Sequence, residues 1–147
     1  MTISADPPAG LVVIESAFGA KETMERLAGA VMRLGMSVAA RVDHAQAAAS
    51  AGLSLRPTEV LIFGNPKVGT ALMQAAQTIG IDLPLKALAW EDKQGKSWLG
   101  YNDPTWLARR HGIAAAAEQS IALMTKALAT AAEQAAGRSA KDSTSTR

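Results

Sequence analysis

The feature that most constrains the fold is residues 59–79, which read EVLIFGNPKVGTALMQAAQTI. Residues 60–63 (VLIF) form a short, continuous apolar run that is typical of a strand covered on both faces. Gly64 allows a turn, Asn65 is a favourable helix N-cap, and Pro66 suits the first helical position because its missing N–H costs nothing there. The apolar residues that follow recur at helical spacing: Val68, Leu72, Ala75, Ala76 and Ile79. The stretch therefore predicts a buried strand, a sharp corner and an amphipathic helix seated on the sheet.

The rest of the chain alternates between strand-like and helix-like stretches. Strands are predicted for residues 11–16, 37–43, 85–91 and 96–101, and helices for residues 21–34, 44–51, 104–110 and 113–136. Residues 92–95 (DKQG) predict a hairpin turn, and a loop of four residues would place Trp90 and Trp98 on opposite faces of the hairpin. We therefore predict an α+β domain with a twisted, mostly antiparallel sheet of about five strands. Two main helices pack on one face of this sheet, and a C-terminal helix is added.

A chain of 147 residues is expected to form one domain. Residues 1–10 hold two prolines and a glycine and predict a flexible arm, and residues 11–112 form the predicted α/β domain. Residues 113–136 are the predicted C-terminal helix, and the polar residues 137–147 predict a disordered tail.

Composition excludes several classes of function. The chain has no cysteine, which rules out disulfides, thiolate catalysis and zinc–thiolate sites. Its net charge of +2 is scattered without a basic stripe, so neither nucleic acid nor a membrane surface is an expected partner. No apolar run reaches the length of a transmembrane helix. The first residues do not resemble a secretory signal, so we expect the cytoplasm, or the periplasm if a signal peptide was removed.

The predicted C-terminal helix carries a narrow apolar seam. Its members are spaced 4, 3, 4, 3 and 4 residues apart: Ala117, Ile121, Met124, Leu128, Ala131 and Ala135. Packing against the sheet is the preferred interpretation, and pairing with a second subunit is the alternative.

Residues 64–70 (GNPKVGT) lie in a strand–loop–helix setting similar to that of a phosphate-binding loop. The loop lacks the lysine that should follow its second glycine, since Thr70 occupies that place and Lys67 comes too early. Nucleoside triphosphate binding is therefore not predicted. A weaker hypothesis is that the helix N-terminus, Asn65, Lys67 and Thr70 hold a small anionic or polar ligand, with Arg56 as a further candidate. The alternative is that these residues only cap the helix or face solvent.

Three other polar residues would make a metal or proton-transfer site if they met in space: His44, Asp103 and His111. They show no ligand spacing of the HExxH type, and each has a local explanation at a helix start or end. The chain also has no GxSxG elbow, so a Ser-His-Asp triad is not predicted. No cofactor follows from these patterns.

Residues 62–92 (IFGNPKVGTALMQAAQTIGIDLPLKALAWED) and 95–113 (GKSWLGYNDPTWLARRHGI) resemble the bacterial domain-of-unknown-function family 302. Residues 39–44 (AARVDH) and 52–66 (GLSLRPTEVLIFGNP) fit the same pattern, and the resemblance covers about residues 10–113. It implies a compact domain of antiparallel sheet and helices similar to the TATA-binding-protein-like architecture, and small homo-oligomers, often dimers. It implies no activity. The recurring positions, to which the resemblance assigns no role, are Asp43, His44, Arg56, Asn65, Pro66, Lys67, Gly69, Thr70, Asp82, Leu83, Pro84, Asn102, Asp103, Pro104 and His111.

Three functions remain open at this point. The favoured one is a non-catalytic domain that binds or senses a small ligand near Asn65, Lys67 and Thr70, acting as a homo-oligomer. The second is a metal-assisted or acid–base enzyme that uses His44, Asp103 and His111. The third is a structural module that dimerises through the seam of the C-terminal helix.

Overall fold

A computed structural model describes residues 7–113, 115 and 117–138 of the chain. The strands are β1 (Leu11–Ser16), β2 (Ser37–Asp43), β3 (Thr58–Gly64), β4 (Leu85–Glu91) and β5 (Ser97–Asn102). The helices are α1 (Ala20–Arg33), α2 (His44–Ser50), α3 (Pro66–Ala75), the 3₁₀ helix η1 (Gln77–Ile81), α4 (Pro104–Arg110) and α5 (Glu118–Ala136). The predicted flexible arm and disordered tail lie largely outside the described residues.

The five strands form one sheet in the order β1-β5-β4-β3-β2, and every neighbouring pair is antiparallel. β1 and β2 are the edge strands. The register is regular except for an irregularity between Val38 and Ala40 where β2 pairs with β3. The predicted α+β class and the mostly antiparallel five-stranded sheet are therefore confirmed.

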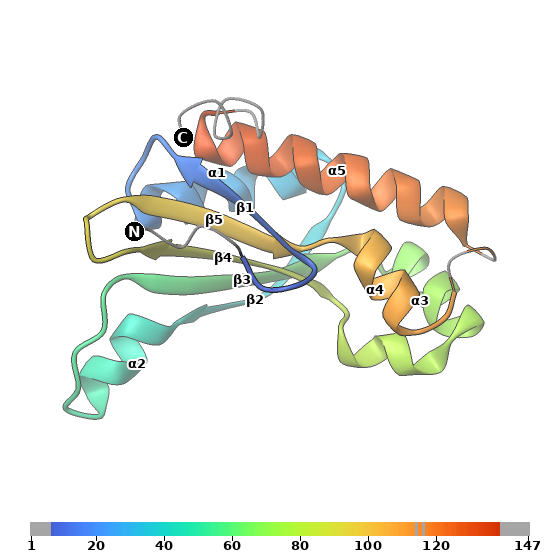
Figure 1. Cartoon of the computed structure of the whole chain (residues 1–147), viewed down its shortest axis with the longest axis horizontal. Coiled ribbons are helices and arrows are strands. Elements are labelled where there is room, and N and C mark those ends of the chain that lie inside the picture. Colours follow the sequence, from blue (N-terminus) through green and yellow to red (C-terminus); the bar gives the residue numbers. More distant parts are fainter. Residues whose placement is uncertain (1–6, 114, 116, 139–147) are drawn as a thin grey trace.

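Two helices, α1 and α5, lie side by side over one face of the sheet (Figure 1). The core lies between this helical layer and the sheet. Large, fully buried side chains come from both layers, among them Met24, Leu27, Val31, Leu61, Phe63 and Leu99. The sequence had suggested that the central helix α3 would sit on the sheet. In the structure α3 lies beyond the strand ends and buries only Leu72, and the C-terminal helix takes its place on the sheet.

The corner between β3 and α3 forms as predicted, with two differences. The side chain of Asn65 accepts a hydrogen bond from the backbone N–H of Lys67 at 2.9 Å, and Pro66 opens the helix. The helix ends at Ala75 rather than near Ile79, because Ala76 adopts an extended conformation before the 3₁₀ turn. The strand is also not covered on both faces, since Leu61 is fully buried whereas its neighbour Val60 is only half-buried.

The seam of the C-terminal helix packs inside its own chain. Helix α5 begins at Glu118, later than predicted, and its seam residues from Ile121 to Ala135 are buried. Arg26 of α1 donates hydrogen bonds to the carbonyls of Gln134 and Ala135 at 2.8 and 3.1 Å, which ties the two helices together. Core packing is therefore confirmed. The hypothesis of dimerisation through this seam is wrong, because the sheet and α1 already occupy it.

The β4–β5 hairpin places its two tryptophans on the same face of the sheet. Trp90 lies directly opposite Trp98 in the register, because β4 ends at Glu91 and β5 begins at Ser97, which leaves a loop one residue longer than the predicted four. Gly95 accommodates the extra residue with a φ of 81°, a conformation that favours glycine. The expectation of opposite faces is therefore wrong, since it assumed a four-residue loop.

Candidate functional site

A cavity of about 470 Å³ lies where the β3–α3 corner approaches α5. Its walls come from four places: the start of β2 with the residues before it, the first turns of α3, residues 83–85 at the start of β4, and one side of α5. We call it the corner cavity. Two partly exposed leucines, Leu34 (42% exposed) and Leu123 (63% exposed), are among its lining residues.

The walls of the corner cavity are mainly apolar. Three methionines line it from three different elements or their flanks: Met36, Met73 and Met124. The polar lining side chains are all neutral: Ser37, Asn65, Thr70 and Ser120. Within the described residues, the hydroxyls of Ser37, Thr70 and Ser120 have no protein hydrogen-bond partner. The cavity therefore offers adaptable apolar contacts and a few free hydrogen-bonding groups, and its lining holds no charged side chain.

Local sequence explains why this corner has an open side. Asn65 uses its side-chain oxygen to cap α3, which starts the helix directly after the end of β3. Helix α3 therefore leaves the sheet instead of lying on it, and α5 approaches from the helical layer above. The space between the two helices is the cavity.

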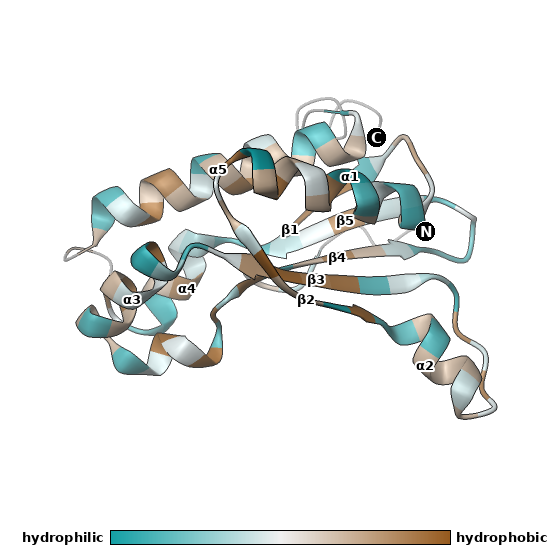
Figure 2. Cartoon of the chain, turned by 180° about the vertical axis from the view of Figure 1, so that it is seen from behind, coloured by the Kyte–Doolittle hydropathy of each residue, from teal (hydrophilic) through white to brown (hydrophobic). Residues whose placement is uncertain are grey.

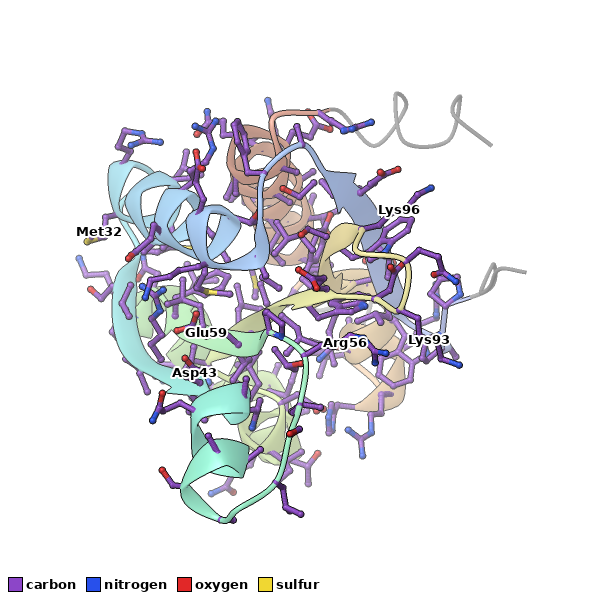
Figure 3. The ribbon with its side chains drawn as sticks, turned by 90° about the vertical axis from the view of Figure 1, so that its left-hand side faces the viewer. Met32, Asp43, Arg56, Glu59, Lys93 and Lys96 are labelled. Atoms are coloured by element: carbon purple, nitrogen blue, oxygen red, sulfur yellow. The ribbon has the colours of Figure 1, made fainter. Side chains whose placement is uncertain are left out.

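Only two of the four predicted ligand-binding residues line the corner cavity. Asn65 and Thr70 line the corner cavity. Lys67 is exposed and is not among the lining residues. Arg56 lies in the loop before β3, at the opposite end of the molecule and on the side of the β4–β5 turn (Figure 3). The predicted cluster is therefore only half assembled, and its two cationic members are outside it.

The structure does not bring together the residues predicted to bind metal. His44 begins α2, at the far end of the sheet from α4 (Figure 1). The side chain of Asp103 accepts a hydrogen bond from the Thr105 N–H at 3.0 Å and so caps α4, as its local sequence suggested. In the part of the chain that the structure describes, no group of three His, Asp or Glu side chains could hold a metal ion. The hypothesis of a shared site of His44, Asp103 and His111 is therefore wrong.

His111 belongs instead to a polar cluster that joins η1 to α4. Its Nε2 lies 2.6 Å from Oδ2 of Asp82, and its Nδ1 lies 2.8 Å from the hydroxyl of Thr78. Arg110 donates from Nη1 to both carboxylate oxygens of Asp82 at 2.9 Å. Residues 28 to 33 positions apart meet here, and no spacing in the sequence identifies such a contact. These contacts hold the 3₁₀ helix η1 against the end of α4.

A second ionic cluster lies at the edge of the helical layer. Arg41 of β2 contacts Glu59 of β3 and donates from Nη1 to Glu25 of α1 at 2.7 Å. The hydrogen bond from Arg41 and its charge lower the pKa of Glu25 below its ordinary value. The cluster ties the exposed edge strand to α1, and none of its three residues is among those that line the corner cavity.

Among the described residues, no helix combines the length and apolarity needed to cross a membrane. Residues 12–131 match the family described as "Domain of unknown function DUF302". The match extends into α5, beyond the end near residue 113 that the sequence motifs suggested.

Two curated relatives are named "Fluoride-specific ion channel FluC 1", from Brucella suis biovar 1 and Brucella abortus biovar 1. A third, from Brucella melitensis biotype 1, is named "Fluoride-specific ion channel FluC 2". Each is 51% identical to this chain over 128 residues, which cover 87% of the chain. The same residues cover only 50%, 47% and 47% of the three relatives, so this chain spans about half their length.

A solved structure has the same fold. It is described as an uncharacterized conserved protein DUF302 from Bacillus stearothermophilus, with a TM-score of 0.77 and 22% sequence identity. The superposition covers 86% of this chain and 98% of the other. At this identity the likeness establishes the architecture alone.

Proposed function

The chain belongs to the DUF302 family, and we propose that it binds a small, largely apolar ligand in the corner cavity without changing it chemically. The observation that carries the proposal is the cavity itself, of about 470 Å³ and with mainly apolar walls. Its volume falls within the ~300–1,000 Å³ of typical ligand pockets, which also combine apolar walls with a few polar groups. The three methionines suit a ligand of irregular shape, because their side chains are flexible and polarisable.

The lining favours an uncharged ligand over the small anion suggested by the sequence. A buried anion needs a cation or several converging N–H donors, and the lining residues include no Lys, Arg or His. Lys67, the cation expected to serve this site, is exposed and lies outside the lining. Neutral hydroxyl groups of Thr70 and Ser120 suit a ligand with one hydrogen-bonding group, such as an alcohol, an amide or a phenol.

The same lining supports binding without catalysis. A serine or threonine hydroxyl becomes a strong nucleophile only beside a general base, such as histidine or a carboxylate. No such base is among the residues that line the corner cavity. His111 and Asp82, which do contact each other, are engaged in the cluster between η1 and α4.

Thermal unfolding in the presence of small probes tests this function. Indole, 2-naphthol and 1-hexanol should raise the melting temperature, whereas acetate, phosphate and fluoride should not. A ligand at ten times its Kd stabilises the folded state by about 1.4 kcal/mol. For a domain of this size the melting temperature should then rise by about 3 °C or more.

A matched pair of variants on α5 makes the test specific. Ala127→Phe fills the corner cavity from its wall, and Ala122→Phe adds the same side chain at an exposed position of α5 outside the lining. We expect the probe effect to vanish in the first variant and to persist in the second. The proposal fails if no apolar probe raises the melting temperature, or if Ala127→Phe leaves the effect unchanged.

A second candidate function is an accessory role beside an ion channel, which the names and lengths of the Brucella relatives favour. In those proteins, roughly half of the chain lies outside the matched region, and that remainder could contain the channel. The test is to delete the matched region from a Brucella relative and express it in a fluoride-sensitive bacterium. We expect the fluoride concentration that halves growth to change. An unchanged concentration would argue against this role.

A further inference from the structure

The edge of the sheet formed by β2 is open. Strand β2 has seven residues, all of them exposed, and within the described residues it pairs with β3 alone (Figure 2). An edge strand points the N–H and C=O groups of alternate residues away from the sheet, where they can bond to another strand. Among the described residues, no other segment donates or accepts a backbone hydrogen bond along this outer side of β2.

The other edge strand, β1, is covered in part. Two of its six side chains are buried, and the N–H of Ala17, which follows it, donates to the carbonyl of Ala136 at 2.8 Å. Edges are commonly protected from pairing by proline, by lysine, by a bulge or by a covering element. β2 has no proline or lysine, and its one basic side chain, Arg41, is held by two glutamates. Its irregularity lies near one end and leaves residues 40–43 in regular register, so this edge remains able to pair.

The open edge of β2 runs directly into the corner cavity. Ser37 and Ala39 of the strand line the cavity, as does Met36 before it. The register passes from Val38 to Ala40, so Ala39 has no partner in β3. A strand added to β2 would therefore bring one of its side chains to the mouth of the cavity. Domains that bind peptides by strand addition combine these two features, since main-chain bonds give affinity and a pocket selects a side chain.

The other end of β2 is acidic. Asp43 ends the strand opposite Glu59, and Figure 3 shows these two residues at the same end of the sheet. Glu25 of α1 contacts the same Arg41 as Glu59 does. These three carboxylates are opposed by two cations, Arg41 and Lys21, the second of which acts on Glu25. One negative charge is left, so this end of the edge favours a cationic side chain.

We propose that β2 binds an extended peptide of a partner protein as a sixth strand, with a large apolar side chain in the corner cavity and a lysine or arginine beside Asp43. The inference rests on the proposed function and deepens it, because the small apolar group in the cavity is then part of a peptide. Ala39 and Asp43 are four residues apart, which is about 13 Å along a strand. Alternate side chains share a face, so the two side chains of the peptide also stand four positions apart.

The direction of the peptide follows from the sheet. Every neighbouring pair of strands is antiparallel, and antiparallel addition continues this pattern. The peptide then runs from the acidic end of β2 toward the corner cavity. Its basic residue comes first, and its apolar residue follows four positions later.

Calorimetric titration of the full chain with short peptides tests the inference. The probe is the terminally blocked peptide TRTVTFT, and the reversed sequence TFTVTRT is a control of the same composition. TRTVTFT should bind at least about tenfold more tightly than TRTVTST, because it buries a phenylalanine side chain. The reversed peptide should bind more weakly than the probe. A probe that does not bind, or that binds no better than TRTVTST, overturns the proposal.

Two N-methylated forms of TRTVTFT distinguish strand addition from simple occupation of the cavity. One form has methyl groups on the amides of its second, fourth and sixth residues, and the other on those of its third, fifth and seventh. Only one edge of an added strand bonds to β2. One form should therefore bind like the probe, and the other should lose at least about tenfold in affinity. Equal affinities of the two forms would overturn strand addition.

Variants of the chain locate the two side-chain sites. Ala127→Phe should lower the affinity for TRTVTFT to that for TRTVTST, whereas Ala122→Phe should change neither. Glu25→Gln removes one carboxylate from the acidic end and should weaken TRTVTFT by about two- to fivefold, but not TQTVTFT. Circular dichroism confirms that each variant is folded. An unchanged affinity for TRTVTFT in folded Ala127→Phe or Glu25→Gln contradicts the corresponding side-chain site.

This test and the test of the corner cavity can fail separately. If indole raises the melting temperature and TRTVTFT does not bind, the cavity keeps its proposed function and strand addition is wrong. If neither has an effect, both proposals fail. A second copy of the chain is the alternative occupant of the edge. In that case saturating TRTVTFT would halve the mass measured by light scattering, and this outcome would overturn a partner peptide as the occupant.

Discussion

The two faces of the sheet are built from the same strands but differ in what covers them. Helices α1 and α5 pack on one face, and no helix of the described residues covers the other, which we call the bare face. In β3, Leu61 and Phe63 point to the helical layer and are fully buried, whereas Val60 and Ile62 point to the bare face and stay half-buried. Their hydrophobicity is alike, and what differs is the layer stacked against them (Figure 2). The comparison teaches that the burial of an apolar side chain depends on the layer packed against it as well as on its own hydrophobicity.

The largest difference between the faces should appear when neighbouring residues are truncated. Leu61→Ala leaves a void in a packed core and should lower the free energy of unfolding by about 2–5 kcal/mol. Val60→Ala, one residue earlier on the bare face, should cost less than about 1 kcal/mol when measured on the monomer, because little packing is lost. Urea unfolding of both variants at low protein concentration makes the measurement.

Equal costs for the two variants in the monomer would mean that the two faces do not differ as described.

A smaller effect is expected at the edge of the covered face. Arg41→Ala removes the bonds to Glu59 and Glu25 that tie β2 to α1, and should lower the free energy of unfolding by about 1 kcal/mol. Added salt should reduce the loss because the pairs are partly exposed. Val42→Ala is the control, since Val42 belongs to the bare face and makes no ion pair. A loss that is larger for Val42→Ala in the monomer would contradict this assignment.

The smallest effect concerns the hairpin of the bare face. The indole N–H of Trp98 donates to Asp92 at 2.8 Å, and this bond, with the N–H groups of Gln94 and Lys96, lowers the pKa of Asp92 below its ordinary 3.8. The charged form is therefore favoured in the folded state. Its contribution to stability is present above pH 3.8 and is lost as the pH falls through the lowered pKa.

Asp92→Asn should thus lower the melting temperature by less than about 2 °C at neutral pH. The gap between the variant and the unmodified chain should close below pH 3.8, when Asp92 itself becomes neutral. Thermal scans between pH 7 and pH 2.5 measure both. If the difference in melting temperature between the variant and the unmodified chain increases as the pH falls, the proposed contribution of the charged Asp92 is contradicted.

Most of the local structure could be predicted from the sequence because it depends on neighbouring residues. Asn65 and Asp103 are helix caps whose side chains reach N–H groups two residues away. Gly35 follows α1 with a φ of 84°, a left-handed conformation in which glycine commonly ends a helix. The site was predictable only in part. Asn65 and Thr70 line the cavity, but the expected cations do not. Lys67 is exposed on the same helix, and Arg56 lies at the other end of the molecule, which only the packing of distant elements decides.

The sequence by itself determined where most of the helices and strands lie, that the sheet is mostly antiparallel and the fold α+β in class, and that the chain lacks a catalytic signature. These properties follow from periodicity and from contacts a few residues apart. Only the tertiary structure decided that α5 rather than α3 covers the sheet, that Trp90 and Trp98 share a face, and that an apolar cavity lies at the corner. An apolar stripe in the sequence indicates that one face of an element is buried, but it does not indicate which distant segment packs against that face.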